Sequence, residues 1–507
     1  MTDLRLEGIT KRFGDFVANE HINLSVETGS IHAVLGENGA GKTTLMNILS
    51  GLYQPDAGHI FLDDRPVQIE SSQAAIAHGI GMIHQHFMLV PSLTVTENIV
   101  LGAEAGLPLR RAAKEAEIAA LSQTYGLAVP PDARVEDLPV GVQQRVEILK
   151  VLYRRAKILI LDEPTAVLTP TEVGSLLRLL RQLATQQHTI IFISHKLDEV
   201  MTLCDTVTVL RRGQVAATVA TQACTHQDLA RLMVGRDVSL TYDKPPTSGG
   251  DTVLSVQDLW VRNRRGLPAV RGVSFELKAG EILGIAGVDG NGQRELADAI
   301  ACLTPIERGR LSLTPGCPLG YIPEDRQKMG LILRFSIARN LILKAFRWRP
   351  FARWGWLQRR EIDRNANTAI QAFDIRAIHH TLSASQLSGG NQQKVVLARE
   401  LSGNPGLIIA MQPTRGLDIG ATEYVQRALL EQRQRGAAIL YISTELEEVM
   451  AMGDRIAVMY EGQFVDILTA ATATTEKLGL LMAGGTPVTV DETAANPDLH
   501  YPMGVNA

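Results

Sequence analysis

The chain has 507 residues, of which 45% are hydrophobic and 21% are charged, and its formal net charge at pH 7 is −4. This length predicts two or more domains, and the near-neutral charge excludes the basic surface field of a general nucleic-acid-binding protein. The four cysteines lack metal or redox spacing, as expected in a reducing cytosol, and the sequence predicts neither a signal peptide nor a membrane span.

The first half alternates short apolar runs with segments of helical periodicity. The runs "IHAVLG" (31–36), "KILILD" (157–162) and "TIIFIS" (189–194) are rich in β-branched residues, which is typical of buried parallel strands. Helices are predicted over 42–52 and 171–186. The pattern predicts an α/β fold in which ligands bind at the carboxyl ends of the strands.

The segment "GENGAGKT" (36–43) follows the first of these strands and opens a helix, as the P-loop pattern requires. Its glycines allow backbone N–H groups to turn toward phosphate oxygens, and the helix start adds roughly half a positive charge. Lys42 should reach the β- and γ-phosphates of a nucleotide, and the Thr43 hydroxyl should bind Mg²⁺. A chance glycine turn is the alternative, and the strand–loop–helix context disfavours it.

Two other strand ends carry candidate catalytic groups. Asp162 ends the second apolar run and would hold Mg²⁺ through water, while Glu163 beside it would polarise the attacking water. His195 follows the third run and would bridge the γ-phosphate to this machinery. A lone histidine is more often structural, but a catalytic role is favoured after such a strand in a P-loop protein. These residues predict Mg²⁺-dependent ATP hydrolysis.

Four landmarks of the first half recur in the same order about 250 residues later, which indicates two homologous halves. The repeats are "GIAGVDGNGQREL" (284–296), "LSGGNQQKVVLAR" (387–399), "LIIAMQPTRGLD" (407–418) and "ISTELEEVM" (442–450). We predict domains over 1–236 and 252–484, a Pro- and Gly-rich linker over 237–251, and a loose polar tail over 485–507.

The second half has lost the charged groups of the first but has gained a glycine pair. Gln293 and Arg294 stand where the P-loop has Lys and Thr. Met411 and Gln412 replace the acidic pair, and Thr444 replaces the histidine. By contrast, "LSGGN" (387–391) stands where the first half has "LPVGV" (138–142), and it should form an anion-binding helix N-terminus.

With this signature, nearly the whole chain resembles the ABC ATPases. The resemblance implies that each half has a RecA-like α/β core, an antiparallel β subdomain and a helical subdomain. It also implies that the signature of one half closes over ATP held by the P-loop of the other. Phe13 matches the aromatic residue that stacks on adenine, and Gln85 matches the Q-loop residue that senses Mg²⁺ and relays to a membrane partner.

The resemblance assigns residues to nucleotide, metal and chemistry. The implied nucleotide-binding residues are Phe13, Gly36, Glu37, Asn38, Gly39, Ala40, Gly41, Lys42, Thr43, Thr44, Asp162, Ser388, Gly389, Gly390, Asn391 and Asp418. The implied Mg²⁺ ligands are Thr43, Gln85 and Asp162, and the implied catalytic residues are Glu163, His195 and Gln85.

Two composite sites are expected, each made of the P-loop of one half and the signature of the other. The altered residues all belong to one of them. The first P-loop, its carboxylates and His195 would pair with "LSGGN" and Asp418, and every element of that set is intact. The opposite set is altered throughout, with Thr169 where Asp418 would be expected. Losing one charge-assisted contact costs about 1.5–3 kcal/mol, whereas losing the water-polarising carboxylate costs roughly 10²–10⁴ in rate. We therefore expect one working site and one that can bind nucleotide without hydrolysing it.

The motifs "MVGR" (233–236), "EDR" (324–326) and "QPTRGLD" (412–418) resemble the fused double-ATPase subunits of bacterial importers of monosaccharides or nucleosides. The segment "VGVQQRVEILK" and the carboxylate-free "AMQPTRGLD" favour the nucleoside branch over the sugar branch. This class implies two permease subunits, an extracytoplasmic binding protein and a peripheral location on the cytoplasmic face of the inner membrane. It implies no nucleic-acid partner and no direct binding of the transported substrate.

A soluble tandem ABC ATPase acting on ribosomes or DNA is the rival from another class. A single catalytic glutamate, a short linker and the lack of sustained heptads disfavour it. The segment "FRWRPFARWGWLQRR" (346–360) is open to three interpretations: nucleic-acid stacking, a surface facing the membrane partner or headgroups, or a packed helical hairpin. The charged run 324–326 is either an interdomain salt-bridge cluster or a solvated turn, and "HQH" (84–86) lacks a third metal ligand.

Overall fold

The chain divides into two compact units in the computed structural model. The first unit comprises Met1–Leu240 with Leu417–Glu423, and the second comprises Thr241–Gly416 with Tyr424–Ala507. The predicted linker and tail fall largely outside the described residues and stay predictions. The structure describes residues 4–84, 87–103, 110–165, 168, 170–194, 196–237, 244, 250–482 and 484.

A six-stranded sheet forms the core of the first unit, in the order β10-β9-β3-β8-β7-β6. Neighbouring strands are parallel except for β10, which runs antiparallel to β9. The central strands β3, β7 and β8 are buried along their whole length, which is why they read as continuous apolar runs. The strands are β3 (Ile31–Leu35), β6 (Ile80–Ile83), β7 (Ile158–Asp162), β8 (Thr189–Ile193), β9 (Thr206–Arg211) and β10 (Gln214–Ala220).

An antiparallel sheet in the order β2-β1-β4-β5 packs over this core. Its inward side chains, such as Leu6 and Ile22, share one hydrophobic cluster with Leu45 and Met46 of the first helix and with Ile191 of β8. The shared cluster holds the P-loop helix between the two sheets. The strands are β1 (Leu4–Phe13), β2 (Phe16–Val26), β4 (Ala57–Leu62) and β5 (Arg65–Val67).

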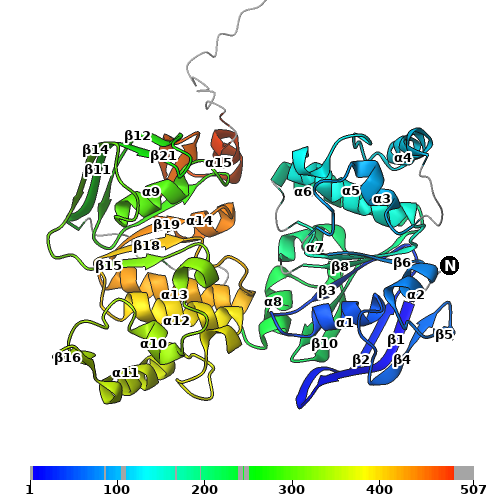
Figure 1. Ribbon diagram of the computed structural model, residues 1–507, viewed down its shortest axis with the longest axis horizontal. Coiled ribbons are helices and arrows are strands. Elements are labelled where there is room, and N and C mark those ends of the chain that lie inside the picture. Colours follow the sequence, from blue (N-terminus) through cyan, green and yellow to red (C-terminus); the bar gives the residue numbers. More distant parts are fainter. Residues whose placement is uncertain are drawn as a thin grey trace, which may run out of the picture. The chain divides into compact units, whose positions relative to one another are not determined.

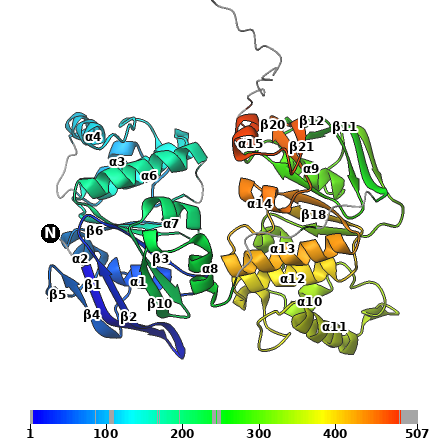
Figure 2. The same cartoon turned by 180° about the vertical axis from the view of Figure 1, so that it is seen from behind.

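Helices cover both faces of the core sheet, and α3, α4 and α5 contact one another to form a helical subdomain (Figures 1 and 2). Among the described residues, no helix of the chain is both long and apolar enough to cross a membrane. The helices of this unit are α1 (Lys42–Leu49), α2 (Ser72–Ala77), α3 (Val95–Val100), α4 (Arg111–Tyr125), α5 (Val140–Tyr153), α6 (Pro170–Thr185), α7 (Leu197–Leu203) and α8 (His226–Val234).

The second unit repeats this plan. Its core sheet has the order β15-β18-β19-β13-β20-β21, the same chain-order pattern as the first core, and its antiparallel sheet has the order β12-β11-β14. The strands are β11 (Thr252–Arg262), β12 (Pro268–Lys278), β13 (Ile282–Ala286), β14 (Arg308–Leu313), β15 (Leu319–Ile322), β18 (Leu407–Met411), β19 (Ala438–Ile442), β20 (Arg455–Tyr460) and β21 (Gln463–Thr469).

Helices α10, α11 and α12 form the helical subdomain of the second unit, next to a two-stranded hairpin of β16 (Ala352–Arg353) and β17 (Trp356–Leu357) (Figure 1). The helices are α9 (Gln293–Ile300), α10 (Ile337–Leu341), α11 (Arg359–Ala372), α12 (Gly389–Leu401), α13 (Ile419–Gln434), α14 (Leu446–Met452) and α15 (Thr475–Met482). The first residues of α13, up to Glu423, are assigned to the first compact unit.

The predicted fold class is confirmed: each unit has an α/β core, an antiparallel β subdomain and a helical subdomain. The two predicted helices are present, with α1 ending three residues earlier than expected, at Leu49. The interpretation of 346–360 as a packed helical hairpin is wrong, because this segment contains the β16–β17 hairpin and its tryptophans are exposed.

Candidate functional site

The P-loop follows β3 and turns sharply into α1. Gly41 caps the helix with φ at 101°, in the left-handed region that favours glycine. A Cβ atom at Gly41 would lie 2.5 Å from both the carbonyl oxygen of Ala18 and Nδ2 of Asn19. Nδ2 of Asn19 also donates a hydrogen bond to the carbonyl oxygen of Gly41, at 3.1 Å. The loop therefore depends on glycine here for both its conformation and its packing.

Lys42 is folded back onto the loop that it follows. Its Nζ donates hydrogen bonds to the carbonyl oxygens of Gly36 (2.7 Å) and Glu37 (3.1 Å). Burial lowers the pKa of Lys42, and the carboxylates of Glu163 and Asp162 oppose that shift. An ammonium group in this setting gains from an added anion, so a phosphate can replace the two carbonyls as its partner.

The acidic pair lies at the carboxyl end of β7. Burial, together with the neighbouring Glu163, raises the pKa of Asp162 to about 6, and Lys42 opposes the shift. Glu163 has φ at 47°, and its backbone N–H donates to the carbonyl oxygen of Ile193 in β8, at 2.9 Å. A divalent cation would offset the cost of a buried carboxylate. The oxygens of Asp162 and of the exposed Thr43 hydroxyl fit the donor set that Mg²⁺ prefers.

A buried carboxylate, that of Glu199, connects the segments that follow β7 and β8. Oε2 of Glu199 accepts hydrogen bonds from the hydroxyls of Thr165 (2.8 Å) and Ser194 (3.2 Å). Thr165 follows Glu163 by two residues, and Ser194 immediately precedes His195. Sequence reasoning missed Glu199, although its repeat in "STELEEVM" was a signal that could have found it. His195 itself, together with Gln85 and Thr169, lies outside the described residues.

Phe13 ends β1 with its side chain 44% exposed. The Tyr53 ring meets it edge-on, with 5.3 Å between the ring centroids, and the ammonium of Lys11 lies 5.7 Å from the Phe13 centroid. An exposed aromatic pair of this kind can stack on a purine base. Tyr53 was not predicted from the sequence, because no spacing rule connects it to Phe13.

In the second unit, the signature segment opens α12. Oγ of Ser388, at the N-cap, accepts hydrogen bonds from the backbone N–H of Asn391 (3.4 Å) and from its Nδ2 (2.9 Å). A Cβ atom at Gly389 would lie 2.7 Å from Nη2 of Arg326. In the first unit, Pro139 occupies the corresponding N-cap of α5 and provides no side-chain cap. A glycine pair at a capped helix start is therefore present in the second unit and altered in the first.

Asp418 belongs to the segment Leu417–Glu423, which is part of the first compact unit. Its Oδ2 accepts a hydrogen bond from the backbone N–H of Asn38, at 3.2 Å, and its Oδ1 accepts one from Ala421 N, at 2.8 Å. Within this unit, Asp418 thus lies against the P-loop and contributes to the field around Lys42.

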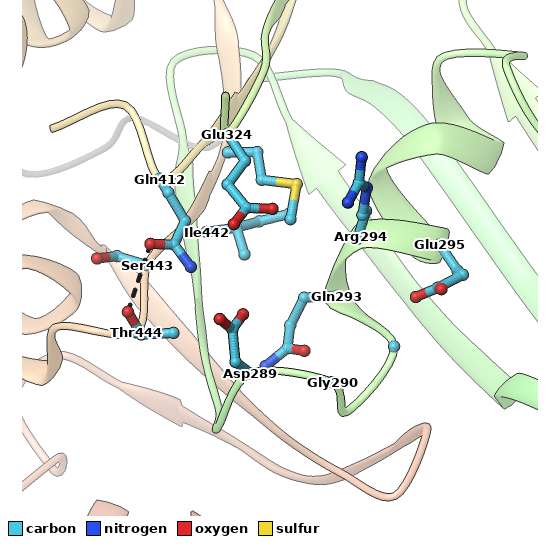
Figure 3. A pocket seen from close by; sticks show the side chains of 12 residues that line it. Asp289, Gly290, Gln293, Arg294, Glu295, Glu324, Gln412, Ile442, Ser443 and Thr444 are labelled. Carbon is cyan, nitrogen blue, oxygen red and sulfur yellow. Dashed lines mark hydrogen bonds between the residues drawn. The ribbon is translucent and has the colours of Figure 1, made fainter. Parts of the chain in front are cut away.

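The second unit has a pocket of about 220 Å³ at the corresponding strand ends (Figure 3). Nε2 of Gln293 donates to the carbonyl oxygen of Val288, at 3.0 Å, much as Lys42 does to Glu37. Gln412 has φ at 44°, and Oγ1 of Thr444 donates to its Oε1, at 3.4 Å. The backbone of a nucleotide site is therefore retained without its charged side chains.

The charges in this pocket differ from those in the first unit. Figure 3 shows the carboxylates of Asp289 and Glu324 pointing into the pocket, whereas Arg294 donates to Sδ of Met329, at 3.1 Å. Glu324 also pairs with Arg415. A triphosphate would meet negative charge here and no buried ammonium among the lining residues that the structure describes.

The charged run 324–326 is not a freely solvated turn. Nη1 of Arg326 donates to the carbonyl oxygen of Arg415, at 2.7 Å, and burial lowers the pKa of Arg326. Oδ1 of Asp325 accepts hydrogen bonds from the backbone N–H groups of Gln327 and Lys328, each at 3.0 Å. These contacts lie within the second unit, and the interdomain role of the cluster stays a prediction.

Comparison with known proteins adds to this geometry. The model of the ABC transporter family matches residues 19–166 and 270–415, one segment in each half. The chain is 47% identical to the nucleoside import ATP-binding protein NupA of Lactococcus lactis, over 96% of this chain and 98% of that protein. It is 46% identical to the guanosine import ATP-binding protein NupO of Bacillus subtilis, over 95% and 98%. It is 44% identical to the glucose import ATP-binding protein TsgD13 of Haloferax volcanii, over 95% and 96%.

Proposed function

The chain belongs to the ABC transporter family as one of its ATPases, and from this premise we propose that it powers the uptake of nucleosides through partner permeases. The observation that carries the proposal is similarity over nearly the whole length of two proteins named for nucleoside and guanosine import. Both P-loop segments lie inside the matched regions, so the likeness includes the site and is not limited to the scaffold.

A sugar importer is the alternative, because the glucose import relative is only slightly less similar. We propose that specificity belongs to the permeases and to an extracytoplasmic binding protein. We propose that two permease subunits hold the chain at the cytoplasmic face of the membrane.

Uptake in a deletion strain tests the substrate. Loss of labelled guanosine or inosine uptake, restored by the intact chain, is the expected result, with ribose and glucose uptake unchanged. Restoration by the Lys42→Ala variant would show that uptake does not depend on this ATPase. Loss of ribose or glucose uptake with normal nucleoside uptake would replace the nucleoside proposal with the sugar alternative.

We propose that hydrolysis takes place at the P-loop of the first unit. Mg²⁺, when bound, neutralises phosphate charge and fixes the phosphate oxygens. Lys42 would exchange its two carbonyl partners for the β- and γ-phosphates, and Asp162 and Thr43 would hold Mg²⁺. Glu163, fixed by its backbone bond to β8, polarises the attacking water. His195 and Gln85 are proposed to contact the γ-phosphate and the metal.

The signature of the second unit is proposed to complete this site. Ser388, Gly389, Gly390 and Asn391 would place a capped helix N-terminus against the γ-phosphate, with Asp418 on the P-loop side. The pocket of the second unit has Gln293 in place of the lysine and Gln412 in place of the proposed water-polarising carboxylate. We propose that nucleotide bound there is not hydrolysed.

A further inference from the structure

The segment 346–360, here called the Trp–Arg hairpin, follows α10 and runs into the first two residues of α11 in the helical subdomain of the second unit (Figure 1). Its short strands β16 and β17 pair antiparallel. Trp348, Trp354 and Trp356 are 71%, 87% and 78% exposed, and Leu357 is 53% exposed. Three tryptophans this open to water serve no packing role within the unit, so their exposure requires another explanation.

The charges of the hairpin are all of one sign. It contains five arginines, all exposed, and no acidic residue. They are Arg347, Arg349, Arg353, Arg359 and Arg360.

The acidic residues that come next are already paired. Oε2 of Glu361 lies 3.3 Å from Nη1 of Arg364, and Oδ1 of Asp363 lies 3.1 Å from Nε2 of His380. The two acids and one arginine of residues 361–364 together offset only one of the five positive charges of the hairpin.

We propose that the Trp–Arg hairpin is a membrane-contact surface that binds anionic phospholipid headgroups. Tryptophan is enriched where membranes meet water, because its ring is apolar and its N–H is polar. Arginine binds phosphate through paired N–H donors, and each basic residue near an anionic leaflet raises the partition coefficient roughly fivefold. On the hairpin, the guanidinium groups can therefore bind lipid phosphates while the neighbouring tryptophan rings contact the upper part of the acyl chains.

The same features fit a protein partner less well. Protein–protein interfaces are also enriched in tryptophan and arginine, but their fully buried centre is formed by complementary packing and is depleted in charged residues as a class. In the hairpin, by contrast, Arg347 and Arg349 flank Trp348, and Arg353 precedes Trp354. The proposal goes beyond nucleoside import, because it concerns lipid and does not depend on which molecule is transported.

Vesicle binding by the purified full-length chain tests this proposal without ATP or permeases. Three of the four tryptophans lie in the hairpin, so intrinsic fluorescence reports on it directly. With vesicles of phosphatidylcholine and phosphatidylglycerol, we expect a shift of emission to shorter wavelength and co-flotation of the protein. With phosphatidylcholine alone we expect neither, and high salt should release the protein.

Two hairpin variants, each with a matched control, separate the contribution of the arginines to vesicle binding from that of the tryptophans. R347Q/R353Q should lower the partition coefficient roughly 25-fold, at about fivefold for each arginine. W354S/W356S should reduce both binding and the spectral shift. The controls R310Q/R435Q and L267S/L303S change exposed residues of the same unit outside the hairpin and should bind as the unaltered chain does.

Three results would overturn the lipid assignment. One is no binding to anionic vesicles, and another is equal binding to neutral and anionic vesicles. The third is hairpin variants that bind vesicles normally but no longer co-purify with the permeases, which would assign the surface to a protein partner. ATPase activity of the purified variants should stay unchanged, so failure of this proposal is distinguishable from failure of the proposed function.

Discussion

Glu163 and Gln412 occupy equivalent positions and differ in one functional group. Both have a left-handed backbone, with φ at 47° and 44°, and both donate their backbone N–H to the last residue of the next strand, at 2.9 and 2.7 Å. A non-glycine residue in this region stores strain of about 1–3 kcal/mol, so both units keep a costly geometry. Only the first unit retains the carboxylate that can use it.

Replacing Glu163 by Gln should therefore remove turnover and spare binding. We expect Glu163→Gln to lower the steady-state ATPase rate by roughly 10²–10⁴, because the general base is lost. ATP binding, measured with a fluorescent analogue, should change little, since Lys42 and the P-loop are untouched. A variant that kept a rate within a few-fold of the unaltered chain would exclude Glu163 as the base.

The reciprocal change at Gln412 is the matched control. Gln412→Glu restores the carboxylate but not the lysine, and it adds a fourth acid to a pocket that is already lined by Asp289, Glu295 and Glu324. We expect no rise in ATPase rate, either alone or combined with Glu163→Gln.

At the scale of elements, one carboxylate in each unit joins the ends of two core strands. In the first unit, Glu199 of α7 accepts hydrogen bonds from the hydroxyls of Thr165 and Ser194, which follow β7 and β8. In the second unit, Glu448 of α14 accepts hydrogen bonds from the hydroxyls of Thr414 (2.6 Å) and Ser443 (3.0 Å), which follow β18 and β19. Burial raises the pKa of Glu448, and these hydroxyls oppose the shift. Because both units keep the connection, its first role is structural.

The pair of variants Glu199→Gln and Glu448→Gln separates structure from catalysis. Each should lower the free energy of unfolding of its unit by about 1.5–3 kcal/mol, the range for hydrogen bonds to a charged group. Only Glu199→Gln should also lower the ATPase rate, because only its loop carries Glu163. Denaturant unfolding and steady-state kinetics on both variants provide the check, and equal kinetic effects would refute the assignment.

The central strand β3 of the first unit has a buried titratable side chain, His32, at the position where β13 of the second unit has Leu283. Burial lowers the pKa of His32 to about 4, and its Nε2 lies 2.8 Å from Oγ1 of Thr208. A lowered histidine pKa means that the folded state binds protons less readily than the unfolded chain. The associated stability is present above pH 6.5 and is lost as the pH falls toward 4.

His32→Leu should therefore flatten the pH dependence of the first unit. Between pH 6.5 and 4 the unaltered chain should lose about 3 kcal/mol of stability through this group. The variant should lack that loss, and Thr208 keeps a hydrogen bond to Thr218, at 2.9 Å. Thermal unfolding across this range measures the slope. Replacing the exposed His59 by Gln should leave the slope unchanged.

At the scale of the whole molecule, two copies of one fold have been specialised in opposite ways. The order of strands in the two core sheets is the same, and so is the placement of the loop after the first core strand. The first unit keeps Lys42 and the acidic pair, whereas the second keeps the glycine signature at α12. Neither unit holds a complete set of residues, which is why the proposed function requires both.

The equivalent residues Lys42 and Gln293 test this asymmetry. Lys42→Ala should lower ATP affinity roughly 10- to 100-fold and should abolish ATPase and nucleoside uptake, because a charge-assisted phosphate contact is lost. Gln293→Ala should leave both activities close to those of the unaltered chain. Purified protein and a complemented deletion strain provide the two measurements, and similar losses in both variants would contradict a single working site.

The sequence by itself determined the duplication and the fold class, and it predicted the P-loop and the acidic pair as the site of hydrolysis. These features depend on local rules: buried parallel strands are apolar throughout, a tight phosphate loop needs glycine, and repeated motifs keep their order.

Only the tertiary structure decided which distant side chains meet. The Glu199 connection, the Phe13–Tyr53 ring pair and the carboxylates of Asp289 and Glu324 in one pocket join residues that no spacing rule relates. It also corrected the segment 346–360 from a packed helical hairpin to an exposed β-hairpin. Burial depends on what the rest of the chain leaves uncovered, and an apolar, aromatic segment has the same letters in a core and on a surface.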